Sequence, residues 1–172
     1  MKLTRRTLIA SAAAVPALAA LSQFRGSGQG VLAGVYDADH PAGAEFARLL
    51  RRENFGAQAV TGDRIRMARD LLATRPPMLA GVTRDADALL FAEVGAEEGY
   101  DLSLELRGNG QGCNAFARDP EWNPLARTFV GAGQGWLGAF AGFVASPSAP
   151  LPLDGGAGAK PIATAWLLTR RA

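Results

Sequence analysis

Between residues 31 and 107 the chain alternates short apolar runs with longer segments of helical periodicity. The run Val31–Tyr36 is typical of a strand that is covered on both faces. Pro41 then suits the first position of a helix, because the N–H that proline lacks would have no intrahelical partner there. The apolar residues that follow recur on one helical face: Ala42, Phe46, Leu49 and Leu50. This segment therefore predicts a strand followed by a helix.

The same strand–helix unit recurs twice. Residues 57–61 and 78–82 predict the second and third strands. Asp63 and Thr83 follow them and are suited to N-cap the next helices, because a short oxygen-bearing side chain can accept from a free helix N–H group. The two helices carry the apolar stripes Ile65, Ala68, Leu71, Leu72 and Ala86, Leu89, Leu90, Val94.

The second half of the chain has a weaker pattern. Residues 100–107 predict a fourth strand that alternates Leu102, Leu104 and Leu106 with polar residues, as in an edge or half-exposed strand. Residues 108–161 are rich in glycine and proline and predict mainly loops. Residues 162–169 are apolar and β-rich. We expect this last strand to join the sheet.

Alternation of strands and helices with short connections favours right-handed crossovers and a parallel sheet. The sequence thus predicts an α/β protein: a small three-layer α/β sandwich with a mainly parallel sheet of about four to five strands. A length of this size suits one domain, which we place at residues 31–172.

The N-terminus carries an arginine pair, Arg5 and Arg6, ahead of an uncharged stretch from Leu8 to Leu21. That stretch contains Ser11 and Pro16 and is shorter than the roughly 20 apolar residues of a membrane-spanning helix. Small residues suited to cleavage follow. The segment resembles a twin-arginine (Tat) export signal. The resemblance implies delivery of an already folded protein to the periplasm by the Tat export machinery.

We therefore expect residues 1–22 to be a twin-arginine signal peptide, cut after Ala19 or Ser22, and residues 23–30 to be a flexible linker. No stable membrane insertion is expected after cleavage. The alternative is that the uncleaved segment stays as a membrane anchor.

Loss of this leader changes the charge balance. Of the 18 Lys and Arg residues, Lys2, Arg5 and Arg6 lie in the leader, and none of the 16 Asp and Glu residues does. The remaining chain holds 15 basic and 16 acidic side chains, a net charge of −1. Nucleic-acid binding needs clustered positive charge on the folded part, so we expect no nucleic-acid partner.

Cysteine and histidine are almost absent, which excludes several kinds of site. Cys113 is the only cysteine and His40 the only histidine, so an internal disulfide is impossible and a four-ligand structural zinc site of the usual type is excluded. We expect no metal and no cofactor. Cys113 itself has three interpretations: a nucleophile, one ligand of a copper-type site with His40, Met67 and Met78, or a buried inert thiol.

Residues 133–138 match the glycine pattern G-x-G-x-x-G of dinucleotide-binding loops. The stretch 127–130 before them is strand-like, but the motif comes late in the chain and not in the first strand–helix unit. A glycine-rich buried helix is the better interpretation, with the four-residue spacings of Gly131/Gly135 and Gly138/Gly142 permitting close backbone approach. A membrane helix is the third possibility.

Ligands of open parallel sheets bind beyond the carboxyl ends of the strands. The polar residues at the predicted ends are candidate ligand-binding residues: Asp37, Asp39, His40, Asp63, Thr83 and Arg84. The alternative is a purely local role, with Asp63 and Thr83 capping helices, Asp37 and Asp39 solvating a turn, and His40 exposed in that turn.

Three short segments occur in the order Val35-Tyr36-Asp37, Gly62-Asp63 and Ala80-Gly81-Val82-Thr83. In this order they resemble a strand end, a turn and a second strand end of small twin-arginine-exported bacterial proteins of unknown function. The resemblance covers about residues 31–107 and implies no particular activity.

These observations together favour an exported periplasmic α/β protein of the non-catalytic type, which binds a partner protein or a small ligand. An accessory subunit of a Tat-exported enzyme is one concrete form of this hypothesis. The alternative is a small periplasmic hydrolase or transferase that uses a strand-end cleft around Asp37, His40, Asp63 and Arg84.

Overall fold

The computed structural model describes residues 33–148, 151 and 162–171. The predicted leader and linker lie outside the described residues. The described part forms one six-stranded sheet in the order β2-β1-β3-β6-β4-β5. Its strands are β1 (Ala33–Tyr36), β2 (Ala57–Ala59), β3 (Met78–Thr83), β4 (Tyr100–Gly108), β5 (Cys113–Ala117) and β6 (Thr164–Arg170).

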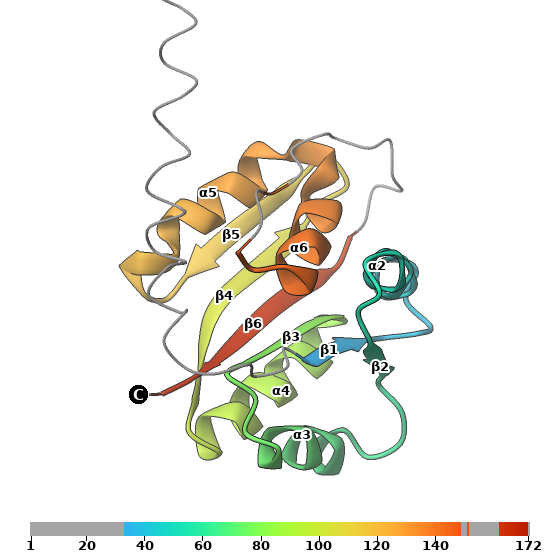
Figure 1. Ribbon diagram of the computed structural model, residues 1–172, viewed down its shortest axis with the longest axis vertical. Helices are drawn as coiled ribbons and strands as arrows, with labels where there is room; N and C mark the ends of the chain where they lie inside the picture. Colours follow the sequence, from blue (N-terminus) through green and yellow to red (C-terminus); the bar gives the residue numbers. More distant parts are fainter. Residues whose placement is uncertain (1–32, 149–150, 152–161, 172) are drawn as a thin grey trace, which may run out of the picture.

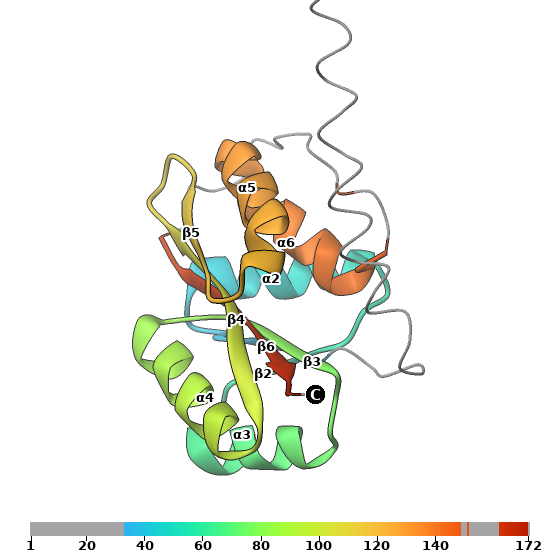
Figure 2. The ribbon, with the colours of Figure 1, turned by 90° about the vertical axis from the view of Figure 1, so that its left-hand side faces the viewer.

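Helices cover both faces of this sheet, so the described part is a three-layer α/β structure (Figure 1, Figure 2). On one face lie α2, α5 and α6, and on the other lie α3 and α4. Their bounds are α2 (Pro41–Arg52), α3 (Arg64–Ala73), α4 (Asp85–Glu97), α5 (Asn123–Gly131) and α6 (Trp136–Ala145). The α/β class expected from the sequence is confirmed.

The sheet is mixed and larger than the sequence predicts. Strand β1 pairs in parallel with β2 and with β3, as expected. Strand β6 then enters between β3 and β4 and runs antiparallel to both, and β5 is antiparallel to β4. The prediction of a mainly parallel sheet of about four to five strands is therefore wrong, because a buried strand reads as an apolar run in either orientation. The prediction that the C-terminal strand joins the sheet is confirmed.

Strand β4 lies inside the sheet, between β6 and β5, and is not an edge strand. Its pairing with β6 shifts register between Leu102 and Leu104, so that Ser103 forms a β-bulge. The extra residue reverses the alternation of side chains. Leu102 packs with the core under α3 and α4, whereas Leu104 packs with the core under α2, α5 and α6. The expectation that these leucines share one face is wrong for that reason.

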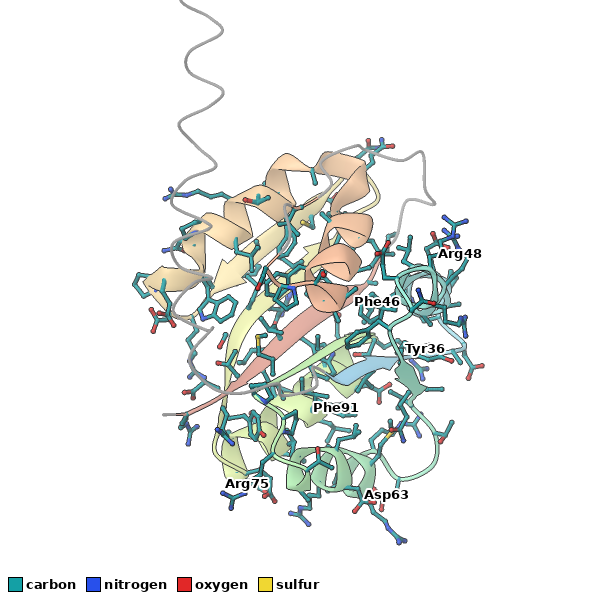
Figure 3. The ribbon with its side chains drawn as sticks, in the orientation of Figure 1. Tyr36, Phe46, Arg48, Asp63, Arg75 and Phe91 are labelled. Carbon is teal, nitrogen blue, oxygen red and sulfur yellow. The ribbon has the colours of Figure 1, made fainter. Side chains whose placement is uncertain are left out.

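Each face of the sheet has its own aromatic core. Phe46 of α2 stacks on Phe140 of α6, with ring centroids 5.6 Å apart. On the opposite face Phe91 of α4 stacks on Trp166 of β6 at 4.9 Å. Figure 3 shows Phe46 and Phe91 on opposite sides of the strands. All four of these rings are essentially inaccessible to solvent, so both helical layers are anchored by buried aromatic area.

Trp166 fits because its cross-strand partner is Gly81. A Cβ atom at position 81 would overlap the six-membered ring of the indole. The indole Nε1–H donates to Oγ1 of Thr83 at 3.0 Å. The ring thus covers the glycine while its polar atom holds a threonine at the end of β3.

Residues 108–131 contain regular structure that the sequence pattern did not predict. Strand β5 occupies 113–117, and the short 3-10 helix η2 (Pro120–Trp122) leads directly into α5. Pro120 begins η2 and Pro124 stands in the first turn of α5, where a missing N–H has no cost. The loop prediction for residues 108–161 is wrong for this part, since its prolines start helices. Residues 152–161 of it lie outside the described residues.

The glycine motif at 133–138 lies between two helices. The stretch 127–130 before the motif belongs to α5, where we expected a strand. The first three residues of the motif form the 3-10 helix η3 (Gly133–Gly135). The context of a dinucleotide loop is therefore missing. The predicted buried helix is present as α6, but Gly131 and Gly138 each have open space where a Cβ would stand. No described helix is long and apolar enough to cross a membrane.

Arg75 adopts a left-handed backbone, with φ of 52°, just after α3. Because left-handed geometry costs a residue with a Cβ about 1 kcal/mol, Arg75→Gly is expected to raise the free energy of unfolding by about 0.5–1 kcal/mol. Urea denaturation measures this. Arg75→Ala keeps the strain while removing the exposed side chain, so it should give no gain. An equal gain from both variants would show that the side chain, and not the backbone, was responsible.

Candidate functional site

The carboxyl ends of β1 and β3 form a topological switch point. These strands are neighbours in the sheet, but α2 leaves β1 toward one face and α4 leaves β3 toward the other. In open α/β sheets the chain diverges at such a point and leaves a crevice where ligands bind. Asp37 directly follows β1 and Arg84 directly follows β3.

Asp37 is 3% exposed and is fixed by its backbone. Its N–H donates to the carbonyl of Val82 at 3.1 Å, and its Oδ1 accepts from the N–H of Asp39 at 3.0 Å. Helix α2 approaches closely, because a Cβ at Gly43 would overlap the Asp37 carbonyl oxygen. Asp37 is therefore a buried carboxylate, and the interpretation that it only solvates a turn is wrong.

Two arginines neutralise two buried carboxylates at this point. Nε of Arg84 lies 2.7 Å from Oδ2 of Asp37. Nη2 of the same arginine lies 3.8 Å from Oδ2 of Asp87, in the first turn of α4. Nε of Arg64, at the start of α3, lies 3.2 Å from Oδ1 of Asp87. This four-residue set, here called the strand-end ion network, links β1, α3 and α4 and has no net charge. Both carboxylates are buried, while both arginines keep access to solvent.

Arg84 also borders an open cavity of about 510 Å³. The cavity lies beyond the carboxyl ends of β3 and β4 and beside the start of β6. His40 and residues 84–86 line one side, and Arg107, Gly108 and residues 162–164 line the other. Its size falls within the range of small-molecule sites in proteins.

The register of three strands sets the spacing of the polar groups in this cavity. Thr164 of β6 is the cross-strand partner of both Thr83 of β3 and Arg107 of β4. The Thr164 hydroxyl donates to Oδ1 of Asp85. The hydrogen bond with Glu105 is the main cause that raises the pKa of Arg107, and the charge of Asp85 adds to it. Asp85 therefore lies beside the start of β6, between Arg84 and Arg107.

His40 lines the cavity while serving as the N-cap of α2. Its Nδ1 accepts from the N–H of Ala42 at 3.3 Å. An imidazole that accepts through Nδ1 carries its proton on Nε2. His40 is half-buried and does not stand free in the turn. Its Nε2–H is the remaining polar group that a ligand can use.

Two of the six candidate residues, His40 and Arg84, line the cavity. Asp37 is not one of the lining residues, but it pairs with Arg84. Thr83 lies just beneath and is fully buried. It accepts from Trp166, and the N-cap of α4 is Arg84, so the prediction that Thr83 caps this helix is wrong. Asp39 is exposed, with its N–H bonded to Asp37.

Asp63 lies apart from the other candidates. Its Oδ1 accepts from the N–H groups of Ile65 and Arg66, so the predicted N-cap is confirmed. Asp63 also borders a second, smaller depression of about 430 Å³ along α3, with Gln58, Arg66 and Asp70 among its lining residues. Figure 3 shows Asp63 at the outer end of α3.

Sequence reasoning missed Arg107, Thr164 and Asp87 as site residues. Asp87 could have been found from its place in the first turn of a predicted helix, where acidic residues are favoured. Arg107 and Thr164 depend on β6 entering antiparallel beside β3, which brings the start of one strand next to the ends of two others. Nothing local in the sequence signals that orientation.

Cys113 does not line the cavity, although its cross-strand partner Gly108 does. It packs in the core under α2, α5 and α6, whereas Met67 packs in the core on the opposite face. The predicted copper-type site of Cys113 with His40, Met67 and Met78 therefore does not form. Burial raises the pKa of the Cys113 thiol to about 11, so at neutral pH the group is a buried, protonated thiol, a state that is inert as a nucleophile.

The Cys113 thiol is expected to react with Ellman's reagent far more slowly in the native protein at pH 7.5 than in denaturant. A folded pKa above the unfolded value also means that the thiol favours folding below about pH 9, and that this contribution is lost as the pH rises toward 11. Thiol titration with and without urea measures the first effect. Labelling of the native protein at the rate of an exposed cysteine would contradict the assignment.

Within the described ranges, no three His, Cys, Asp or Glu side chains are grouped so that they could hold a metal ion. Comparison of the chain with models of protein families, with curated proteins and with solved structures gave no match.

Proposed function

We propose that this protein is an exported, non-catalytic α/β protein that binds a small ligand in the strand-end cavity. The observation that carries the proposal is the position of that cavity. It opens beside the switch point of the sheet, where α/β proteins bind ligands, and polar groups from α2, β3–α4, β4 and β6 converge on it.

A hydrolase or transferase at the same place is supported less well. Asp63 lies outside the cavity, and His40 uses its basic Nδ1 to cap α2. The hydroxyl of Thr164 donates to Asp85, but a carboxylate is a weak base for a hydroxyl group. These contacts orient groups for binding better than they would activate a nucleophile.

Export is the second part of the proposal and rests on the sequence of the leader. Arg5 and Arg6 would commit the chain to the Tat machinery, and the mature protein would begin after Ala19 or Ser22 in the periplasm. A double Arg5→Lys, Arg6→Lys variant should then accumulate uncleaved inside the cell. Its normal export and processing would refute the twin-arginine route. Co-purification with a second exported protein would support the accessory-subunit form of the proposal.

Blocking the cavity tests the binding proposal. Ala86 lines the cavity and is exposed, so Ala86→Tyr should fill it without disturbing a core. Leu89 lies on the same helix, is 62% exposed and is not part of the cavity, which makes Leu89→Tyr the matched control. In a thermal-shift screen of small molecules, a true ligand should raise the Tm of the wild type and of Leu89→Tyr but not that of Ala86→Tyr.

Two outcomes of this screen would overturn the binding proposal. The first is that no compound raises the Tm of the wild type. The second is that every stabilising compound acts equally on Ala86→Tyr, because such compounds bind elsewhere.

A further inference from the structure

We propose that the ligand of the strand-end cavity is a small zwitterion, with an ammonium group that binds Asp85 and a carboxylate that binds Arg107. This inference rests on the proposed function and specifies its substrate class. It follows from how the charges of the cavity are already paired.

The positive charges at the cavity are matched by carboxylates of the protein itself. Arg84 is paired with Asp37, and Arg107 is paired with Glu105. A simple anion would therefore approach two guanidinium groups that are each accompanied by a carboxylate, with Asp85 between them. Repulsion from these three carboxylates offsets much of the attraction, so phosphate or sulfate is a poor fit.

Unused donors remain on Arg107. A guanidinium offers five N–H donors in a planar fork, and within the described residues the fork of Arg107 contacts only Glu105, through Nε, and the face of the Phe116 ring, 5.9 Å from its centroid. The terminal nitrogens are free to bind a carboxylate in bidentate fashion. The ring of Phe116 also restricts the guanidinium, which lowers the entropy lost on binding.

Asp85 supplies the complementary group. Its Oδ1 is held by the Thr164 hydroxyl, and no cation of the described part of the chain lies within ion-pair distance of it. Its Oδ2 is therefore available to an ammonium group. A ligand that brings both charges pairs with Asp85 and uses the free donors of Arg107 at the same time. A lone cation would leave those donors unused and would lie beside the positive N-terminal end of α4.

The test uses amino acids as probes. The standard L-amino acids are titrated into the full chain without its leader by isothermal calorimetry, and the tightest binder is compared with its N-acetyl derivative and its C-terminal amide. Each modification removes one charge. Removal of either charge is expected to weaken binding by at least about tenfold, as for a hydrogen bond between charged groups.

Variants assign each charge to its partner. In Asp85→Asn the amino acid and its N-acetyl derivative should bind equally, because the ammonium partner is gone. In Arg107→Gln the amino acid and its amide should bind equally. Arg127→Gln changes an exposed arginine of α5 that does not line the cavity and should leave all three affinities unchanged.

The outcomes separate this inference from the proposed function. Equal binding of the three probes to the wild type would overturn the zwitterion assignment, as would variants that do not shift the preferences. If no amino acid binds while another compound passes the Ala86→Tyr test, the inference fails and the proposed function stands. If nothing passes that test either, both fail.

Discussion

Replacement of Trp166 by alanine is expected to lower the free energy of unfolding by about 3–5 kcal/mol, the range for a buried tryptophan. The indole is 1% exposed, stacks on Phe91 and covers Gly81 across the pair β3–β6. Its loss leaves a cavity in the core under α3 and α4 and removes the donor to Thr83. Equilibrium denaturation in urea, followed by circular dichroism, measures the change. A loss below about 1 kcal/mol would mean that the ring is not part of a packed core.

The contact between Trp166 and Gly81 can be tested separately. Gly81→Ala should cost about 1–3 kcal/mol in the wild type, because the new methyl group overlaps the indole. In the Trp166→Ala background the same change should cost much less. Gly138→Ala is the matched control: it has open space in helix α6 and should stabilise by about 0.5–1 kcal/mol. Additive costs of Gly81→Ala and Trp166→Ala would contradict the proposed overlap.

Arg84→Gln is expected to destabilise the protein by about 2–4 kcal/mol, and by more than Asp37→Asn does. Removal of one partner of a buried ion pair leaves the other charge uncompensated. Loss of Arg84 leaves Asp37 without a cation and Asp87 with Arg64 alone. Loss of the Asp37 charge is milder, because the Arg84 side chain is 55% exposed and can turn to water. We expect about 1–2 kcal/mol for Asp37→Asn, after discounting for this exposure.

A double-mutant cycle tests the network directly. The double variant Asp37→Asn, Arg84→Gln should be more stable than Arg84→Gln alone, because the uncompensated carboxylate is then absent. Arg66→Gln serves as the control, since Arg66 pairs only loosely with Asp70 at 3.9 Å on the surface and should change stability by no more than about 0.5 kcal/mol. If Asp37→Asn proves costlier than Arg84→Gln, the exposed arginine is not what holds the buried carboxylates.

The sequence predicted those parts of the fold that are encoded locally. A parallel strand–helix unit is contiguous in the chain, so β1 to α4 appear as apolar runs, caps and helical stripes in their order. The antiparallel insertion of β6 is decided by tertiary packing, which no local pattern records. The bulge at Ser103 inserts one extra residue in β4, so the alternation of its side chains between the two faces changes there. Pro120 and Pro124 start helices, and a proline pattern in the sequence fits loops equally well.

The residues of the candidate site also differ in whether local sequence could predict their place. Asp37, His40 and Arg84 follow β1 and β3, and their meeting at one sheet edge could be predicted from parallel pairing alone. Asp63 follows β2 in the same way, but β2 lies at the sheet edge beyond β1, so its polar end is displaced from the cavity. Arg107 and Thr164 reach the cavity only through the position of β6.

Native mass spectrometry of the protein purified without denaturation from its own host tests the central claim most directly. The proposal predicts the mass of the chain without its leader plus a small bound molecule, which is retained in Leu89→Tyr and absent in Ala86→Tyr. The mass of the bare cleaved chain in every sample, or a bound molecule that Ala86→Tyr retains in full, would contradict ligand binding in the strand-end cavity.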